Sequence, residues 1–283
     1  MRHVLRAGPT RILDDRDLQD VTRLLDADPV SGAFVASRIE SAGLDPWRLG
    51  AEVWGYRADG DLSAICYSGA NLVPVGVGDM EARAFADRAR RQGRRCSSIF
   101  GDAGGVLGLW KALEPTWGRA REVRRVQPLL ATDRASRAAA DPLVRLVGPD
   151  ELEVLLPACV AMFTEEVGIS PVVGDGGVLY RARVAELVGA GRAFARIEDG
   201  EVVFKAEVGA VSRRVCQIQG VWTRPDLRGR GIGRAGTAAV VDVCLRDIAP
   251  VVSLYVNEFN HPARRVYDDV GFTQVGTFAS VLF

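Results

Sequence analysis

The sequence predicts an α+β fold made of two tandem units, each with a mixed, mostly antiparallel central sheet flanked by helices. Two observations carry this prediction. Residues 51–69 and 193–211 both read as β-hairpins, and in each half a helix, a strand and a second helix follow. The segment 131–141 is small, polar and without apolar periodicity, which is typical of a linker. The chain therefore divides into predicted domains of residues 1–130 and 142–283.

The second half has an element order that can be followed along the chain. Asp199-Gly200 is a strong hairpin signal, Asp150 is a suitable helix cap, and Gly271 ends the last helix. An antiparallel meander precedes a strand–helix–strand crossover. The predicted elements are a strand at 144–147, helices at 150–163 and 175–190, strands within 193–211 and at 216–223, a helix at 231–248, a strand at 251–257, a helix at 262–270 and a bent strand or two short strands over 272–283.

The first half repeats this plan in pattern, although not in residues, and the repeat suggests duplication of one domain. Its hairpin turns at Asp59-Gly60-Asp61. The predicted elements are helices at 14–28 and 30–43, the hairpin at 51–69, a helix at 80–93, a strand at 96–101 and a helix at 106–113.

Composition excludes several classes of protein. Hydrophobic residues make up 48% and charged residues 25%, an ordinary globular mixture, and the formal net charge of zero predicts no broad surface for nucleic acid or an anionic membrane. No apolar run approaches the ~20 residues of a membrane span, and the N-terminus lacks the apolar core of a signal peptide. Five cysteines without a C-x-x-C pair, and only two histidines, argue against a disulfide framework or metal site and fit a reducing cytoplasm.

A glycine-rich loop at 229–236 supports two readings. Its letters, G-R-G-I-G-R-A-G, satisfy the dinucleotide fingerprint G-x-G-x-x-G from Gly231 onward. Read from Arg228, R-G-R-G-I-G instead satisfies the [Q/R]-x-x-G-x-[G/A] pattern that holds the pyrophosphate of coenzyme A. Both depend on the free N–H groups and partial positive charge of a helix N-terminus.

Three features favour the coenzyme A reading over a nicotinamide oxidoreductase. In a dinucleotide fold the first glycine follows the strand almost directly, whereas here residues 224–230 intervene. Only 47 residues remain after Gly236, too few for the rest of a doubly wound sheet. The preceding strands form hairpins. Arg228 and Arg230, which the dinucleotide reading ignores, can neutralise phosphate charge.

The segment V-W-T-R-P-D-L-R-G-R-G-I-G at 221–233 resembles the cofactor motif of the GNAT superfamily of N-acetyltransferases. L-Y-V-N-E-F-N-H-P-A-R-R-V-Y-D-D-V-G-F at 254–272 is similar to the next GNAT motif. The resemblance covers about 142–283. The first half has only Gly76-Val-Gly78 in place of such a loop, without arginines, and resembles the degenerate first half of tandem GNAT proteins that does not bind acetyl-CoA productively.

The resemblance implies a set of cofactor-binding residues. The pantetheine arm of acetyl-CoA would lie between the strand at 216–223 and the parallel strand at 251–257, with the backbone of Val221 and Thr223 bonded to its amides. Asn260 would contact the same arm or cap the short helix that follows. The strand end and the pyrophosphate loop together comprise Val221, Trp222, Thr223, Arg228, Gly229, Arg230, Gly231, Ile232 and Gly233.

The catalytic assignments that the resemblance implies are less complete. Tyr267 matches the tyrosine that gives a proton to the departing thiolate, and its alternative role is packing. Many GNAT proteins carry a glutamate on the strand before the loop, but this strand has Gln217 and Gln219. Glu207 on the preceding strand is the nearest acid, either as a base acting directly or through water, or as an ion-pair partner of Lys205.

The expected activity is direct transfer of an acetyl group from acetyl-CoA to a primary amine, of a small molecule or a protein. Glu165 and Glu166 lie in the segment that forms the acceptor wall in the family, where they would attract a cationic amine or remain exposed helix-end charges. The alternative is a non-catalytic acyl-CoA sensor or interaction protein. We expect no metal, no nucleic acid and no membrane partner. The acceptor and the oligomeric state are not readable from the sequence.

Overall fold

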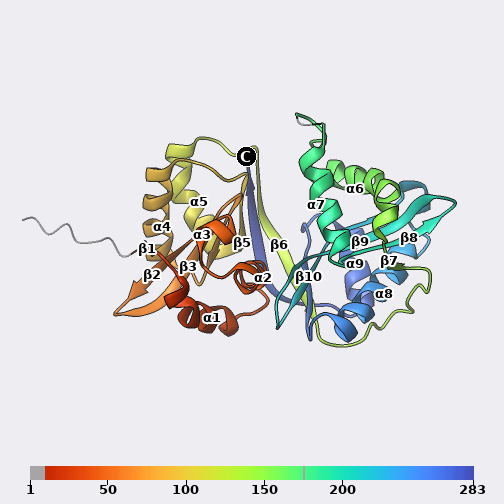
Figure 1. The fold of residues 1–283 in the computed structure, drawn as a ribbon, viewed down its shortest axis with the longest axis horizontal. Coiled ribbons are helices and arrows are strands. Elements are labelled where there is room, and N and C mark those ends of the chain that lie inside the picture. Colours follow the sequence, from red (N-terminus) through yellow and green to blue (C-terminus); the bar gives the residue numbers. More distant parts are fainter. Residues whose placement is uncertain (1–9, 175) are drawn as a thin grey trace, which may run out of the picture. The chain divides into compact units, whose positions relative to one another are not determined.

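The computed structural model describes residues 10–174 and 176–283, which form two compact units (Figure 1). The first unit contains the chain up to Leu129 together with Tyr255–Phe259 and Gln274–Phe283, and the second contains Leu130–Leu254 and Asn260–Thr273. The sequence division assigned all residues after 142 to the second domain. The structure instead gives the C-terminal strand to the first unit, because this strand pairs with a strand of that unit.

The first unit is a sheet with helices on both faces. Its strands run in the order β1-β2-β3-β4-β5-β12, antiparallel except where β4 meets β5. Its elements are β1 (Thr10–Ile12), α1 (Leu18–Ala27), α2 (Ala33–Ala42), α3 (Pro46–Leu49), β2 (Glu52–Ala58), β3 (Asp61–Ser68), β4 (Asn71–Val75), α4 (Asp79–Gln92), β5 (Ser98–Asp102), α5 (Ala103–Trp117) and, from the end of the chain, β12 (Thr273–Leu282).

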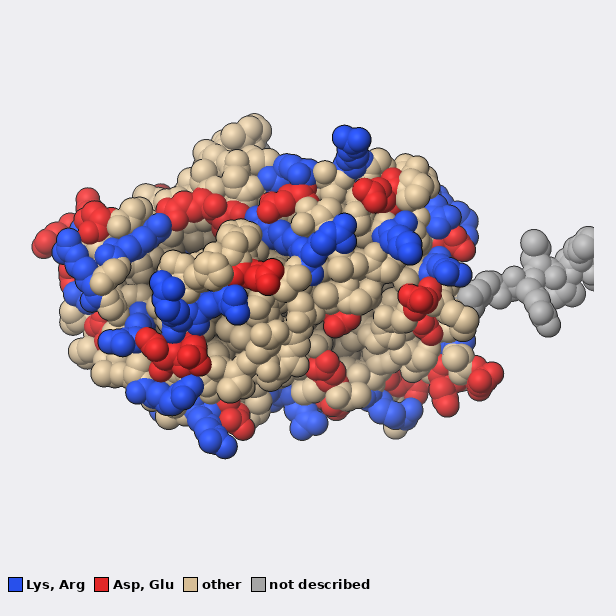
Figure 2. Space-filling model, turned by 180° about the vertical axis from the view of Figure 1, so that it is seen from behind, with Lys and Arg blue, Asp and Glu red and all other residues tan. Residues whose placement is uncertain are grey.

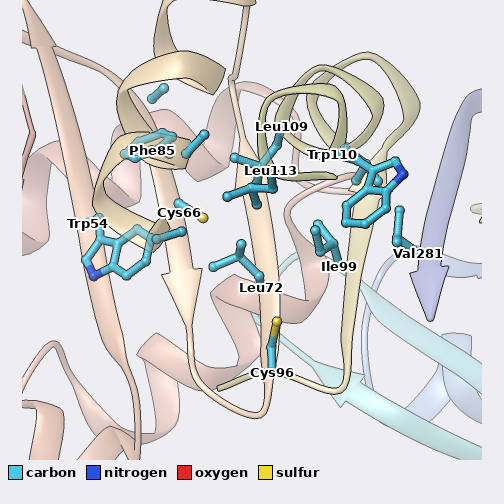
Figure 3. Close-up of a cluster of buried hydrophobic side chains, with 14 of the residues drawn as sticks. Trp54, Cys66, Leu72, Phe85, Cys96, Ile99, Leu109, Trp110, Leu113 and Val281 are labelled. Carbon is cyan, nitrogen blue, oxygen red and sulfur yellow. The ribbon is translucent and has the colours of Figure 1, made fainter. Parts of the chain in front are cut away.

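Alternate residues of each strand separate two apolar layers in this unit. Ala64 and Cys66 of β3 join the layer under α4 and α5, which also contains Val281 of β12 (Figure 3). Ile65 and Tyr67 of the same strand join the layer under α1 and α2. This two-residue period is what a strand buried on both faces requires.

The second unit places its strands in the order β11-β10-β9-β8-β7. Pairing is antiparallel except between β10 and β11, as predicted for a meander followed by a crossover. Its elements are β7 (Arg145–Leu146), α6 (Leu152–Val167), α7 (Val178–Gly189), β8 (Ala193–Glu198), β9 (Glu201–Val211), β10 (Cys216–Thr223), α8 (Ile232–Asp247), β11 (Val252–Tyr255) and α9 (His261–Val270).

Several boundaries differ from the sequence prediction. Strand β6 (Glu122–Thr132), which joins the two units, was not predicted, and the strand expected at 144–147 has two residues. The helix expected at 175–190 begins at Val178, and residue 175 itself lies outside the described residues.

The segment predicted as a loose linker is packed against the second unit. The N–H of Arg137 donates to the carbonyl of Val270 at 2.9 Å, and the N–H of Asp141 donates to that of Ala235 at 3.0 Å. The buried carboxylate of Asp141 also pairs with Arg196 at 2.8 Å. Polar composition misled the prediction because these side chains have partners in the fold.

The two units share a hairpin register, which supports duplication. In the first unit, β2 and β3 pair as Tyr56↔Ala64 and Ala58↔Asp61, with an irregularity after Tyr56. The same pairs recur 140 residues later as Arg196↔Phe204 and Glu198↔Glu201, with the irregularity after Arg196. A repeat of both register and irregularity identifies equivalent positions in the two units.

Truncation of Val281 to alanine tests the contribution of β12 to the first unit. Val281 is fully buried in the layer of Figure 3, so Val281→Ala should lower the free energy of unfolding by about 2–3 kcal/mol. Val275→Ala on the same strand is the control, since Val275 is 53% exposed and its loss should cost less than about 0.5 kcal/mol. Equal effects in urea denaturation would contradict the placement of Val281 in this core.

Candidate active site

Strands β10 and β11 separate after a short stretch of pairing. Their parallel register includes only Cys216↔Val252 and Gln217↔Ser253, while β10 continues along β9 as far as Thr223. Within the described part of the chain, no further pairing joins β10 to β11. The backbone of β10 beyond Gln217 is therefore open on the side that faced β11, where an extended ligand can bond to it.

A β-bulge lies in the separated part of β10. Gln219 pairs with Glu207 and Trp222 with Lys205, so β10 advances by one residue more than β9 between these pairs. Gly220 in the bulge has a φ of +59°. A Cβ atom there would lie 3.0 Å from Cε of Met162 and 3.2 Å from Nζ of Lys205, so both conformation and space favour glycine.

The glycine–arginine loop follows β10 and leads into α8. Residues 228–231 are exposed, and Gly229 and Gly231 have φ values of +77° and +82°. The first α-helical bond of this turn is donated by the N–H of Ala235 to the carbonyl of Gly231, so the N–H groups before it point outward from the helix end. Exposed amides, a helix N-terminus and two arginines are features that favour the binding of an anion.

Arg228 already has two acceptors in this structure. Its Nε donates to the carbonyl of Thr223 at 3.0 Å, and its Nη2 donates to Oε2 of Glu165 at 2.7 Å. Nε1 of Trp222 donates to the other oxygen of Glu165 at 3.2 Å. Glu165 therefore joins α6 to the loop, a contact beyond the two roles left open by the sequence, which were attraction of an amine and an exposed helix-end charge. Both partners of the Glu165–Arg228 pair are about half exposed, so it contributes at most ~1 kcal/mol and can be exchanged for a ligand.

A buried ionic cluster lies beneath the bulge. Nζ of Lys205 donates to Oε1 of Glu207 at 2.5 Å and to Sγ of Cys159 at 3.4 Å. Burial alone would lower the pKa of Lys205, but the charge of Glu207 and the contact with Cys159 outweigh it and raise that pKa. Burial likewise raises the pKa of the Cys159 thiol to about 12. Lys205 is thus an ammonium and Cys159 is an unreactive thiol at neutral pH.

Two more predicted residues of the site, Asn260 and Tyr267, belong to helix α9 and its N-cap. Tyr267 is buried, with its ring edge-on to Phe272, and burial together with the negative charge of Glu166 raises the pKa of its hydroxyl above the usual value. Oδ1 of Asn260 accepts a hydrogen bond from the N–H of Ala263 at 3.2 Å. Asn260 therefore caps α9, one of the two roles that the sequence left open. Arg234 of α8 and Asp269 of α9 approach to 3.6 Å and link the two helices.

The structure thus brings most of the predicted residues into one strand–loop–helix unit. Val221, Trp222 and Thr223 end β10, the loop follows, and Ile232 and Gly233 open α8. Sequence analysis missed Cys159 and Gly220. A lone glycine in a strand pattern is a signal for a bulge and could have identified Gly220. Cys159 carries no local signal, because only the fold brings α6 to β9.

The corresponding loop of the first unit has different chemistry. Strand β4 leads through Gly76–Gly78 into α4, whose first turn carries Asp79 and Glu81. The carboxylate of Glu81 accepts the N–H of Gly78 at 3.1 Å, so an anion already occupies this helix end. An adjoining cavity of about 760 Å³ is lined by four aspartates, Asp20, Asp28, Asp61 and Asp102, and by Arg23. Negative charge at this position disfavours a phosphate.

Residues 10–174 and 176–283, the part of the chain that the structure describes, contain neither a metal site nor a membrane-spanning helix. They contain no group of three or more His, Cys, Asp or Glu that could hold a metal ion, and all five cysteines are free and buried. They contain no helix with the length and apolar character to cross a membrane. Figure 2 shows acidic and basic side chains interspersed on the face it draws.

Comparison with protein families assigns the second unit. Residues 173–272 match the model of the acetyltransferase (GNAT) family, and residues 51–155 match a domain of unknown function, DUF4081. Residues 173–272 therefore form an acetyltransferase domain of the GNAT family. No curated protein matches the sequence.

Solved structures share the fold over both units. A Drosophila protein has 12% identity, covers 98% of this chain and 99% of its own, and has a TM-score of 0.65. A GCN5-related N-acetyltransferase from Sphaerobacter thermophilus has 18% identity, coverage of 96% and 95%, and a TM-score of 0.57. A tandem GNAT protein from the clavulanic acid biosynthesis pathway has 16% identity, coverage of 96% and 98%, and a TM-score of 0.50. The predicted α+β GNAT fold with two tandem units is confirmed.

Substitution of Gly220 tests the bulge. Gly220→Ala should destabilise the protein by about 1–3 kcal/mol, because it adds contacts with Met162 and Lys205 to an unfavourable φ. Gly200→Ala is the matched control, since Gly200 has a φ of +76° but nothing within 4 Å of its Cβ position. Equal urea midpoints for the two variants would contradict the close packing of Met162 and Lys205 around Gly220.

Proposed function

We propose that the second unit transfers an acetyl group from acetyl-CoA to a primary amine. The observation that carries the proposal is the separation of β10 from β11 at a bulge, immediately before a glycine–arginine loop and a helix N-terminus. Proteins of this family generally use acetyl-CoA, and a strand gap beside an anion site matches a ligand with an extended arm and a pyrophosphate.

The loop suits a pyrophosphate in shape and in charge. At Gly229 and Gly231 a Cβ atom would meet nothing within 4 Å, so the backbone is open to close approach. Arg228 and Arg230 flank the turn and supply two positive charges. The phosphate would replace Glu165 as the anion bound to Arg228, and the main-chain groups of Val221 and Thr223 would hold the pantetheine arm.

The chemistry needs a nitrogen lone pair, a polarised thioester and a proton for the leaving sulfur. The amine nitrogen bonds to the carbonyl carbon, and the carbon–sulfur bond then breaks. An N–H group of the β10 bulge would donate to the carbonyl oxygen as negative charge develops there. Tyr267 would give its proton to the sulfur. The surplus proton of the nitrogen would pass to Glu207 and then to water, and water would return a proton to Tyr267.

A non-catalytic acyl-CoA sensor is the second candidate function. It is favoured by one observation, the ion pair with Lys205 that already occupies one oxygen of Glu207. Such a protein would bind acetyl-CoA without turnover.

Release of free thiol from acetyl-CoA in the presence of amine probes, namely 2-phenylethylamine, spermidine and glycinamide, distinguishes a transferase from a sensor. The buried free cysteines support a reducing, cytoplasmic setting for either.

Loss of the two loop arginines tests the cofactor site. Arg228→Ala/Arg230→Ala should weaken acetyl-CoA binding in isothermal titration at least about a hundredfold, because two charge-assisted contacts of roughly 1.5–3 kcal/mol each are lost. Arg213→Ala/Arg214→Ala removes the same charge at the opposite end of β10 and should leave binding unchanged. Similar affinities for both double variants would place coenzyme A elsewhere.

Removal of the Tyr267 hydroxyl tests its role as the acid. Tyr267→Phe keeps the ring against Phe272, so kcat should fall about a hundredfold while the KM for acetyl-CoA is retained. Since burial raises the pKa of Tyr267 above ~10, the hydroxyl stays protonated to at least that pH, and the wild type should keep its proton donor throughout the neutral range. Tyr56→Phe in the first unit is the control, and an unchanged kcat for Tyr267→Phe would assign this tyrosine to packing.

A further inference from the structure

The ion pair of Lys205 and Glu207 is in direct contact with the β10 bulge. Lys205 is 0% exposed and Glu207 is 5% exposed. A Cβ atom at Gly220 would lie 3.2 Å from Nζ of Lys205 and 3.3 Å from Oε2 of Glu207, so both charges border the residue that forms the bulge. The pair therefore belongs to the same part of the molecule as the proposed reaction.

Stability does not account for such a pair. Removing an ammonium and a carboxylate from water costs several kcal/mol each, and a well-packed apolar pair of similar volume is often equally stable or more so. The surroundings on the helix side are apolar. Cys159 of α6, which contacts Lys205, belongs to a buried apolar cluster that also contains Leu155 and Met162. An apolar pair would suit them without any loss of solvation.

The first unit shows that the fold accepts an apolar pair at these positions. Its hairpin repeats the pairing of the second unit 140 residues earlier, so Lys205 corresponds to Ile65 and Glu207 to Tyr67. Ile65 and Tyr67 are both buried in the layer under α1 and α2. The same fold thus builds a core here without charge.

The first unit also lacks the bulge. Tyr67 pairs with Val73 and Ile65 with Val75, so the two strands advance by equal steps. In the second unit the corresponding pairs, Glu207↔Gln219 and Lys205↔Trp222, enclose one extra residue of β10. The charged pair and the bulge are therefore present together in one unit and absent together from the other.

We propose that Lys205 is a positioning residue for acetyl transfer, holding the carboxylate of Glu207 turned so that its second oxygen meets the acceptor amine at the bulge. This inference rests on the proposed function. Oε1 of Glu207 accepts from both Lys205 and Cys159, which fixes the carboxylate on one side. Oε2 accepts from Nε2 of Gln219 at the long distance of 3.4 Å and lies against Gly220.

An ionised carboxylate accepts hydrogen bonds only. An amine that donates one N–H to Oε2 would therefore have its lone pair directed by the carboxylate, beside the strand that holds the thioester. Lys205 contributes by setting the direction of the Glu207 carboxylate and touches no reactant itself. Its removal should impair kcat and leave the affinity for acetyl-CoA, which depends on the 228–233 loop, unchanged.

The experiment replaces the charged pair of the second unit with an uncharged pair, as the first unit has at these positions. Lys205→Met alone leaves a buried carboxylate without its counter-ion and should lower the melting temperature. The double variant Lys205→Met/Glu207→Leu restores an apolar pair and should recover wild-type stability. Both are compared with the wild type by thermal denaturation, by isothermal titration with acetyl-CoA, and by thiol release with 2-phenylethylamine, spermidine and glycinamide. Arg57→Met is the control, since it removes one cation from the buried Asp17 in the first unit, where the β3–β4 pair has no bulge.

A positioning role predicts that stability is recovered without activity. We expect the double variant to bind acetyl-CoA like the wild type while its kcat falls about a hundredfold, and we expect Arg57→Met to keep its kcat. We expect the same fall in kcat for Lys205→Met assayed below its melting temperature. A folded Lys205→Met variant with kcat within twofold of wild type would overturn the inference and leave the proposed function intact. A wild type that binds acetyl-CoA but releases no thiol with any probe would overturn the proposed transfer, and the inference with it.

Discussion

One extra residue in β10 is the constraint on which the candidate site depends. Because β10 advances further than β9 between Gln219 and Trp222, its backbone turns away from regular pairing at the point where β11 has already separated. The bulge frees main-chain groups of the strand end, and the next residues form the loop and the N-terminus of α8. Cofactor loop, strand gap and buried ion pair are all positioned relative to this irregularity.

A buried ion pair, which loses solvation energy, lies against the bulge. Lys205 and Glu207 face α6 from positions where the duplicated hairpin has Ile65 and Tyr67. Glu165, further along α6, contacts the loop through Arg228 and the strand through Trp222. Helix α6 thus contacts both the bulge, through Met162, and the glycine–arginine loop, through Glu165. The two units differ in these contacts far more than in their topology.

The sequence was sufficient for the topology and for the position of the glycine–arginine loop before α8, because both depend on local patterns. The hairpin at Asp199-Gly200 and the loop at 228–233 are turn and glycine signals that tertiary structure did not override. The catalytic details were less predictable because they depend on contacts between distant residues. The pairing of Glu165 with Arg228 joins positions 63 residues apart, and that of Cys159 with Glu207 joins positions 48 apart. The polar composition of 131–141 likewise gave no sign of its hydrogen bonds to Ala235 of α8 and Val270 of α9.

The return of β12 to the first unit has a consequence for the order of folding. Strand β5 ends at Asp102, and the strand that completes the sheet beside it begins at Thr273. During synthesis from the N-terminus, the first unit has most of its helices and strands long before Ala279 and Val281 are made, and its core stays open on that side. Closing so long a loop costs entropy before any contact is gained, so assembly of this unit is a late and slow event. The second unit has its own meander and helices nearer in sequence, so its contacts close shorter loops.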